Sequence, residues 1–261
     1  MLFESLCGIL GTWTTDIFCK VWGYGNLMRI LGFIPARSGS KRLKNKNLKI
    51  FLGHPLIYHT LNFSKKIDIS EIFVSTDSRT ILSYCKKMGV KNNYLRPKKL
   101  SGDNSQIKDA ILHAINWLAV NQNKKFDAIM LLQPTTPYRD IKEVNKIIKI
   151  FIKNNYDSLA TVSKIKAKDH PYFIVKISKN NKWKYLLNRN TNSSNTQDYP
   201  KNYYIDNGQA YLCKLQFLKK YKKFIVENKT FLFKSKINII DIDDLEDFRI
   251  SEFRIKNNLV Y

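Results

Sequence analysis

A loop of small and basic residues carries the strongest chemical signal in this sequence. It reads ARSGSKRLKNKN over residues 36–47. Three consecutive small residues at positions 38–40 let backbone N–H groups approach an anion closely. Positive charge of the kind that a triphosphate requires comes from Arg37, Lys41 and Lys46. The GxxxxGK[ST] spacing of a P-loop is absent, so the alternative interpretation is a glycine-containing turn with solvated basic side chains.

A pair of aspartates near the C-terminal end has the chemistry of a metal site. Asp241 and Asp243 stand at the end of a run, residues 236–242, that reads as a strand. Side chains two apart on a strand point to the same face, so two carboxylates can share one cation. Mg²⁺, with Mn²⁺ as the alternative, is a hard cation that prefers such oxygen ligands. The competing interpretation is an acidic helix N-terminus, which Asp244 and Glu246 fit better than the first pair.

A third polar motif follows another apolar run. Residues 128–132 are strongly apolar and lead into the sequence QPTTPYR. Two prolines make this a rigid polar ledge, on which Gln133 can hydrogen-bond a base or a sugar. Farther along, Asn207 and Gly208 interrupt a stretch that otherwise reads as strand, which marks a turn, a bulge or the close approach of a ligand.

The composition admits several kinds of partner. Hydrophobic residues make up 44% of the 261 residues, enough for a substantial core. The formal net charge of +24 favours anionic partners such as a nucleotide, a nucleic acid or an anionic surface. The lysines are spread along the chain without a basic tail, a zinc-finger pattern or an RNP-type aromatic pattern. A solvated lysine surface therefore explains the charge best, and we expect neither a nucleic-acid nor a membrane partner.

The cysteines and histidines indicate neither a redox site nor a zinc site. The four cysteines are too far apart for a CxxC pair, and the four histidines show no metal-ligand spacing. We therefore expect a reduced, cytoplasmic protein.

Short apolar runs alternate with amphipathic patterns from residue 28 onward. Strands are expected at residues 29–34, 71–75, 90–95, 128–132, 158–162, 203–213, 230–233 and 236–242. Helices are expected at residues 55–65, 78–88, 107–121, 141–152 and 245–257. This alternation predicts an α/β fold with a parallel sheet. Ligands bind beyond the carboxyl ends of such strands, where polar motifs stand at residues 35–47, 75–77 and 133–139.

Residues 1–27 read differently from the rest of the chain. They hold two of the four tryptophans but only one lysine, and charged residues interrupt their apolar run. The segment is too short and too interrupted to span a membrane, and it lacks the basic start of a signal peptide. Because Met28 opens MRILGFIPARSGSKR, we interpret residues 1–27 as an atypical leader that is not native and residues 28–261 as the domain. The alternative is a short leader that binds a membrane or a partner.

A second departure from the pattern lies at residues 164–202. Periodicity weakens there, and the run NTNSSNT is typical of a loop. We expect a small excursion from the core sheet.

Six motifs occur in the order found in the acylneuraminate cytidylyltransferases, the CMP-N-acetylneuraminic acid synthetase family. They read IPARSGSKRLKNKN, VSTDS, LRPKKLSGDNS, LLQPTTPYR, DNGQAYL and DIDDLED. The chain resembles this family from about residue 29 to residue 258, and the first motif distinguishes it from the Kdo cytidylyltransferases. The resemblance implies a Rossmann-like α/β fold and a homodimer built through the excursion. It also implies that CTP and a nine-carbon acidic sugar react to give a CMP-sugar and pyrophosphate.

The resemblance further implies roles for particular residues. The phosphates and ribose of CTP would be held by Arg37, Lys41, Lys46 and Asn47, of which Arg37 and Lys46 would act in catalysis. Nucleotide placement would involve Arg96 and Ser105, and the sugar acid would contact Gln133 and Asn207. Mg²⁺ would be bound by Asp241 and Asp243. Animal members carry a functional arginine in the run where this chain reads NTNSSNT, so no residue is assigned to the sugar carboxylate.

Three hypotheses follow. The leading one is a cytidylyltransferase for sialic acid or for a related acid such as legionaminic or pseudaminic acid. The second is a nucleotidyltransferase that uses another sugar or another base. The third is a basic nucleic-acid-binding protein, which the net charge alone would permit. Carboxylates at a phosphate site repel nucleic acid unless a metal intervenes, so Asp241 and Asp243 favour an enzyme.

Overall fold

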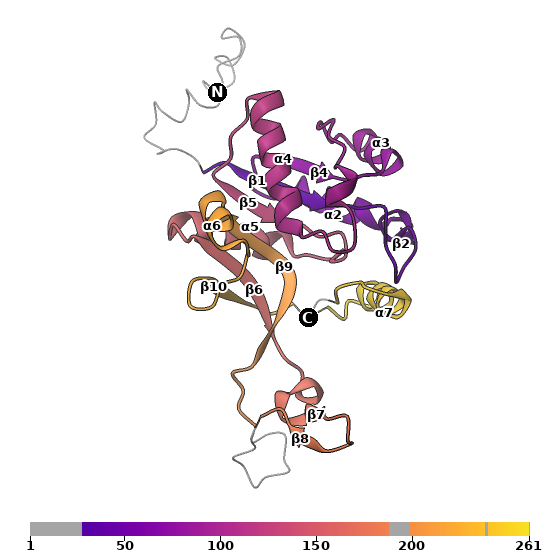
Figure 1. The fold of residues 1–261 in the computed structure, drawn as a ribbon, viewed down its shortest axis with the longest axis vertical. Coiled ribbons are helices and arrows are strands. Elements are labelled where there is room, and N and C mark those ends of the chain that lie inside the picture. The colour runs from indigo at the N-terminus through magenta and orange to yellow at the C-terminus, as the bar shows by residue number, and fades with distance from the viewer. Residues whose placement is uncertain (1–27, 188–198, 238–239, 261) are drawn as a thin grey trace, which may run out of the picture.

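A six-stranded sheet forms the centre of the protein. The computed structural model describes residues 28–187, 199–237 and 240–260. Across the sheet the strands lie in the order β10-β6-β9-β5-β1-β4 (Figure 1). Their bounds in chain order are β1 Ile30–Pro35, β4 Glu71–Ser75, β5 Ala128–Leu131, β6 Ser158–Lys164, β9 Tyr204–Lys214 and β10 Phe231–Ser235.

Five strands of this sheet run in one direction. β1 pairs in parallel with both β4 and β5, and β6 pairs in parallel with β10. β9 is antiparallel to both β5 and β6, so it is the one reversed strand of the sheet. The predicted α/β fold, a mostly parallel sheet flanked by helices, is confirmed.

Helices cover both faces of the sheet (Figure 1). One face carries α2 (Leu56–Ser64), α3 (Arg79–Lys87) and α5 (Ile141–Lys153). The other face carries α4 (Ile107–Gln122) and α6 (Leu215–Tyr221). A last helix, α7 (Leu245–Lys256), packs through Phe248 against β2 (Ile50–Phe51), which pairs with β3 (His54–Pro55). Short 3₁₀ helices are η1 Lys46–Leu48, η2 Lys98–Leu100, η3 Ala167–Asp169 and η4 Pro171–Phe173.

Strand β1 supports the apolar layers on both faces. Ile30 and Ile34 lie in the cluster that includes α2, α3 and α5, whereas Leu31 and Phe33 lie in the cluster that includes α4. A strand that is covered on both faces reads as a nearly continuous apolar run, which is why no hydrophilic alternation marks it in the sequence. Because β1 is buried on both sides, the basic loop that follows it starts from a fixed position.

The predicted strand at residues 90–95 is wrong as an element, although the segment does lie along the sheet edge. Its side chains alternate between buried and exposed, and it makes a single parallel bridge, from Leu95 to Thr76 of the segment after β4. In place of a ladder, the buried Asn92 side chain bonds the backbone of Val74 twice. Oδ1 accepts from the Val74 N–H at 3.0 Å, and Nδ2 donates to the Val74 carbonyl at 2.9 Å.

The predicted strand at residues 236–242 is also wrong. Residues 236–237 and 240–243 form no ladder, and residues 238–239 lie outside the described part. Residues 236–237 follow the end of the edge strand β10, and residues 240–243 lead into α7. Asp244 instead begins that helix with a capping box, in which its side chain accepts from Asp247 N–H. The alternative interpretation of an acidic helix N-terminus is therefore correct for Asp244.

Residues 165–187 and 199–203 of the expected excursion lie outside the six-stranded sheet. Strands β7 (Val175–Ile177) and β8 (Trp183–Tyr185) form a two-stranded antiparallel sheet of their own, which lies apart from the core (Figure 1). The run NTNSSNT and the leader at residues 1–27 lie outside the described residues. Among the described residues, no helix is long and apolar enough to cross a membrane.

Removing the Asn92 side chain tests whether it completes the sheet edge. Asn92→Ala leaves a buried N–H and a buried C=O of Val74 without these partners, so the free energy of unfolding should fall by about 2–4 kcal/mol. Urea denaturation measures this change. Asn93→Ala is the matched control, because Asn93 is exposed and its bond to Lys86 is at the surface, so its effect should stay within about 0.5 kcal/mol. Equal effects of the two substitutions would contradict the role of Asn92.

Candidate active site

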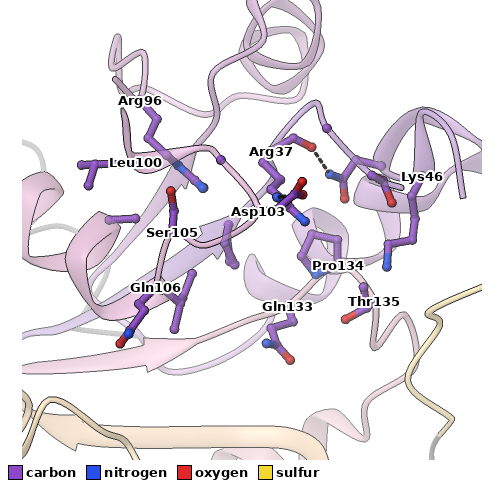
Figure 2. A pocket seen from close by; sticks show the side chains of 17 residues that line it. Arg37, Lys46, Arg96, Leu100, Asp103, Ser105, Gln106, Gln133, Pro134 and Thr135 are labelled. Carbon is purple, nitrogen blue, oxygen red and sulfur yellow. Dashed lines mark hydrogen bonds and ion pairs between the residues drawn. The ribbon is translucent and has the colours of Figure 1, made fainter. Parts of the chain in front are cut away.

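A cavity of about 270 Å³ opens at the carboxyl ends of β1, β4 and β5. These three strands are neighbours in the sheet, so the segments that follow them meet at one edge. The loop before α4 closes the remaining side. Figure 2 shows Arg96 and Ser105 on one side of this cavity, Lys46 on the other, and Arg37 with Asp103 between them. Predicted site residues that line the cavity are Arg37, Lys46, Asn47, Arg96, Ser105 and Gln133.

Hydrogen bonds at both ends shape the basic loop. The buried Asn47 donates from Nδ2 to the Arg37 carbonyl at 2.9 Å, which draws the two ends together. The carboxylate of Asp77, just after β4, accepts from the Ser38 N–H at 2.8 Å and from the Ser38 hydroxyl at 2.7 Å. Burial raises the pKa of Asp77, but the hydrogen bonds from Ser38 outweigh it and hold that pKa below its ordinary value. The predicted motif VSTDS therefore acts by fixing the loop.

Lys46 links the loop to the acidic segment. Its side chain is 13% exposed, and Nζ donates to the Ile242 carbonyl at 2.9 Å. The same nitrogen lies 3.5 Å from Oδ1 of Asp243, whose Oδ2 lies 3.1 Å from Arg42. The predicted proximity of the two motifs is therefore present, although Asp243 faces two cations of the loop.

Arg96 lies in the cavity wall beneath the end of β4. It is 5% exposed, and its Nε donates to the Ser75 hydroxyl at 2.9 Å. Nη2 donates to the Ser75 carbonyl, and the Arg96 N–H donates to the Thr76 carbonyl at 2.7 Å. Burial lowers the pKa of Arg96, while Tyr94 and Asp77 raise it. The bonds to Ser75 position a guanidinium beside the space that the cavity offers to a ligand.

A buried arginine holds the polar ledge in place. Arg139 donates from Nη2 to the Gln133 carbonyl at 2.8 Å and from Nη1 to the Thr136 carbonyl at 2.5 Å. Its Nε donates to the Gln209 carbonyl of β9 at 3.1 Å. Burial lowers the pKa of Arg139 to about 9, and the charge of Asp241 raises it. Gln133 thus lies on a loop whose carbonyls are held by Arg139, and its side chain lines the cavity (Figure 2).

The sequence interpretation missed Asp103, which also lines the cavity. Its carboxylate lies 3.0 Å from Nη1 of Arg37 and 2.7 Å from Nζ of Lys41. Lys41, whose side chain is 79% exposed, does not line the cavity itself but pairs with Asp103, which does. Hydrogen bonds from Lys41, then from Arg37, lower the pKa of Asp103. The motif LRPKKLSGDNS contained this residue, but nothing in its local pattern distinguishes an ion-paired aspartate from a solvated one.

Asn207 is not among the residues that line the cavity. It is 7% exposed, its Oδ1 accepts from the Thr161 hydroxyl at 2.6 Å, and its Nδ2 donates to Ser163 Oγ at 2.7 Å. The register between β9 and β6 shifts beside it, and Gly208 has a φ of 67°. Of the three alternatives left open by the sequence, a turn, a bulge or the close approach of a ligand, the register shift with a left-handed glycine is typical of a bulge. The contacts of Asn207 join β9 to β6. Its contact with a sugar stays a prediction.

A second cluster contains residues that do not line the cavity. The Asp206 carboxylate accepts from the Gly208 N–H at 3.3 Å and interacts with the phenol of Tyr211. Burial raises the pKa of Tyr211, and hydrogen bonding to Asp206 with the charges of Asp206 and Asp241 raises it further. Tyr211 therefore stays a neutral phenol at ordinary pH. Sequence reasoning named neither Asp206 nor Tyr211 as a site residue, although both lie in the motif DNGQAYL.

The carboxylates fit a weakly held divalent cation. Asp241 is exposed and Asp243 half-exposed, on either side of the buried Ile242. No group of three or more His, Cys, Asp or Glu side chains that could hold a metal occurs among the residues that the structure describes. Mg²⁺ takes one or two carboxylates and completes its shell with water and substrate phosphates, so this donor set suits it when a nucleotide is bound.

Comparison with known proteins identifies relatives along most of the chain. Residues 31–253 match the sequence model of a family described as cytidylyltransferase. The chain is 36% identical to the CMP-N,N'-diacetyllegionaminic acid synthase of Legionella pneumophila over 142 aligned residues. The aligned residues make up 54% of this chain and 60% of that protein. It is 29% identical over 233 residues to the pseudaminic acid cytidylyltransferase of Campylobacter jejuni, covering 88% and 98%. The N-acylneuraminate cytidylyltransferase of Escherichia coli is 25% identical over 234 residues, covering 85% and 51%.

Solved structures share the fold at low identity. A CMP:2-keto-3-deoxy-manno-octonic acid synthetase complexed with CTP has a TM-score of 0.62 and 17% identity, covering 88% of this chain and 99% of that one. The 4-diphosphocytidyl-2C-methyl-D-erythritol synthase of Anaerococcus prevotii has a TM-score of 0.58 and 11% identity, covering 88% and 96%. These likenesses establish the architecture of the sheet and helices.

Proposed function

This chain belongs to the cytidylyltransferase family, and we propose that it transfers CMP from CTP to a nonulosonic acid of the sialic type. The observation that carries the proposal is the cavity at the carboxyl ends of β1, β4 and β5. Its wall combines cations for phosphates with amide and hydroxyl groups for a base or a ribose. The products are a CMP-sugar and pyrophosphate.

Each wall of the cavity has a function in this reaction. Arg37 and Lys46 face the triphosphate as the catalytic cations, and Lys41 reaches it from the exposed end of the loop. Asn47, Arg96 and Ser105 hold the ribose and the base. Gln133 on the ledge contacts the sugar acid. Asn207 supports that side through the bulge in β9.

The chemical step is an in-line displacement at the α-phosphorus. The anomeric hydroxyl of the sugar forms a bond to that phosphorus, the bond to the β-phosphate oxygen breaks, and the hydroxyl proton passes to solvent. Such a step depends on alignment and on neutralisation of the charge that develops on the leaving pyrophosphate. The basic loop supplies that neutralisation from a position fixed by Asp77 and Asn47.

Mg²⁺, or Mn²⁺, completes the proposal as the cofactor. Asp241 and Asp243 would hold it, and when bound it supplies positive charge at the phosphate oxygens. The ion pairs of Asp243 with Arg42 and Lys46 support this assignment, because they place that carboxylate beside the cations that face the phosphates.

The identity of the acidic sugar has more than one candidate. N-acylneuraminic acid is the leading substrate, by the motif resemblance and by the name of the Escherichia coli relative. Legionaminic and pseudaminic acids are the second candidates, which the names of the Legionella and Campylobacter relatives favour. All three are acidic sugars, so the proposed role of the cations and of the ledge is the same for each.

We propose a cytoplasmic homodimer as the working form. The excursion from the sheet and the neighbouring part of β9 expose large apolar side chains: Ile177 by 62%, Trp183 by 60%, Leu186 by 54% and Ile205 by 58%. Patches of this kind mark interfaces on soluble proteins. The described cysteines, Cys85 and Cys213, are free and buried, which supports a reducing compartment.

Pyrophosphate release tests the reaction. Activity should appear with CTP and a nonulosonic acid, and not with ATP, GTP or UTP. Arg37→Ala and Lys46→Ala should each raise the barrier by about 2–4 kcal/mol, a loss of roughly thirtyfold to a thousandfold in kcat/KM, because a charge-assisted phosphate contact is lost. Lys44→Ala is the matched control. Lys44 is an exposed lysine of the same loop that does not line the cavity, so its loss should stay below about threefold. Arg37→Ala with unchanged turnover and CTP affinity would reject the assignment.

Metal dependence is the second test of this function. Mg²⁺ should bind weakly to the free protein and more tightly when CTP is present, as followed by calorimetric titration. Asp241→Asn and Asp243→Asn should abolish this tightening and lower turnover by at least about a hundredfold. Asp244→Asn is the control, because it removes an equal charge next to the pair while asparagine still caps α7, so both turnover and the melting temperature should be retained. Activity that persists in EDTA would remove the metal from the proposal and reopen the nucleic-acid hypothesis.

The oligomeric state tests the interface. Light scattering should report a dimer for the parent protein, and a double substitution of Ile177 and Trp183 by Ser should give a monomer that still melts cooperatively. Val120 is the control, since it is an equally apolar and 74% exposed position on α4, far from the excursion in the chain, and Val120→Ser should remain dimeric. A parent protein that is monomeric at micromolar concentration contradicts the proposal.

A further inference from the structure

One carboxylate occupies cations that the proposed substrate needs. Asp103 contacts Arg37 with Oδ1 and Lys41 with Oδ2, so each of its oxygens serves a different cation. Arg37 lines the cavity, and so does Asp103 itself (Figure 2). A carboxylate that bridges two basic side chains presents negative charge and accepting oxygens to them, as a phosphate group does.

The backbone around Asp103 is suited to movement. It lies in a turn after η2 with exposed neighbours on both sides, and its own side chain is 46% exposed. The turn is closed by a hydrogen bond from the Ser105 N–H to the Gly102 carbonyl at 3.1 Å. Described contacts of the Asp103 carboxylate are those with Arg37 and Lys41. The turn can therefore shift without disturbing an apolar cluster.

Asp243 makes a similar bridge but is held differently. It pairs with Arg42 and Lys46 of the same loop. Its backbone N–H donates to Asp247 at the start of α7, and the preceding Ile242 is buried. The two carboxylates thus bracket the basic loop, one fixed by the core and one carried by a surface turn.

We propose that Asp103 is a positioning residue that occupies the phosphate-binding cations of the nucleotide-free protein and yields them to the phosphates of the nucleotide. This rests on the proposed function, because it requires a polyphosphate in the cavity. In the absence of nucleotide, Asp103 keeps Arg37 and Lys41 turned toward the cavity and limits their mutual repulsion. On binding, the phosphates take over both contacts and the Asp103 side chain is released.

The proposal predicts that substitution of Asp103 raises the affinity for CTP, whereas a structural role of Asp103 predicts a lower affinity. Asp103→Asn removes the competing charge, so CTP should bind about threefold to tenfold more tightly in EDTA, as expected for the loss of two exposed ion pairs that the ligand must break. If Asp103 only held the loop in its active shape, the same substitution would weaken binding in EDTA, and if it were a metal ligand, the substitution would weaken binding in Mg²⁺. Calorimetric titration of CTP, with and without Mg²⁺, measures this, and thermal melting confirms that each variant is folded.

Two controls isolate the contact. Asp109→Asn removes an equal charge from the exposed start of α4, six residues away, and should leave the affinity unchanged. In an Arg37→Ala background, Asp103→Asn should tighten binding by less than it does in the parent. Asp103→Ser provides a second variant and should act in the same direction as Asp103→Asn.

The outcomes separate this inference from the proposed function. Unchanged or weaker CTP binding by both Asp103 variants overturns the inference and leaves the cytidylyltransferase proposal intact. Tightening by Asp109→Asn equal to that by Asp103→Asn overturns it as well, because the effect would then be one of net charge. A parent protein that binds no CTP overturns both.

Discussion

The burial of Ile242 is the contact on which the arrangement of the site depends. Its side chain is fully buried in a cluster with Leu43 of the basic loop and Phe248 of α7. Its N–H donates to the Thr135 carbonyl at 2.8 Å, and its carbonyl accepts from Lys46, 196 residues away in the chain. One residue thereby joins the basic loop, the ledge and the acidic segment. Because Ile242 faces the core, the aspartates on either side of it face outward without needing a strand ladder.

A buried polar network supports the ledge in a comparable way. Arg139 donates hydrogen bonds to the carbonyls of Gln133, Thr136 and Gln209. Its guanidinium lies over the ring of Phe63, 5.5 Å from the ring centroid. The Gln209 side chain continues the network to Glu143 of α5 and to the Ser235 hydroxyl of β10. A buried charge is tolerated only when its donors are satisfied, so these carbonyls are held where the guanidinium needs them. The position of Gln133 at the cavity is a consequence of that requirement.

Local patterns allowed the prediction of every α-helix named above except α6, of most strands of the six-stranded sheet and of the motifs that follow β1, β4 and β5. Apolar runs and amphipathic periods are properties of a few consecutive residues, and adjacent parallel strands then bring their ends together. Failures had a common cause in tertiary contacts. Residues 90–95 alternate like a strand because they lie against the sheet, but Asn92 replaces the ladder. The contact of Asp103 with Arg37 spans 66 residues, so no local pattern could indicate it.

The charges of the basic loop are balanced by one carboxylate that is held by the core and one that is carried by a surface turn. Five cations within ten residues of the basic loop repel one another, and the carboxylates of Asp103 and Asp243 offset that repulsion by pairing with four of them. Asp243 is tied to the core through Ile242 and α7, so it cannot leave when an anion arrives. Phosphates bound at Lys46 would therefore lie close to a permanent carboxylate. Like charges at such proximity are costly unless a cation stands between them, which is the physical reason to expect a divalent metal at this site.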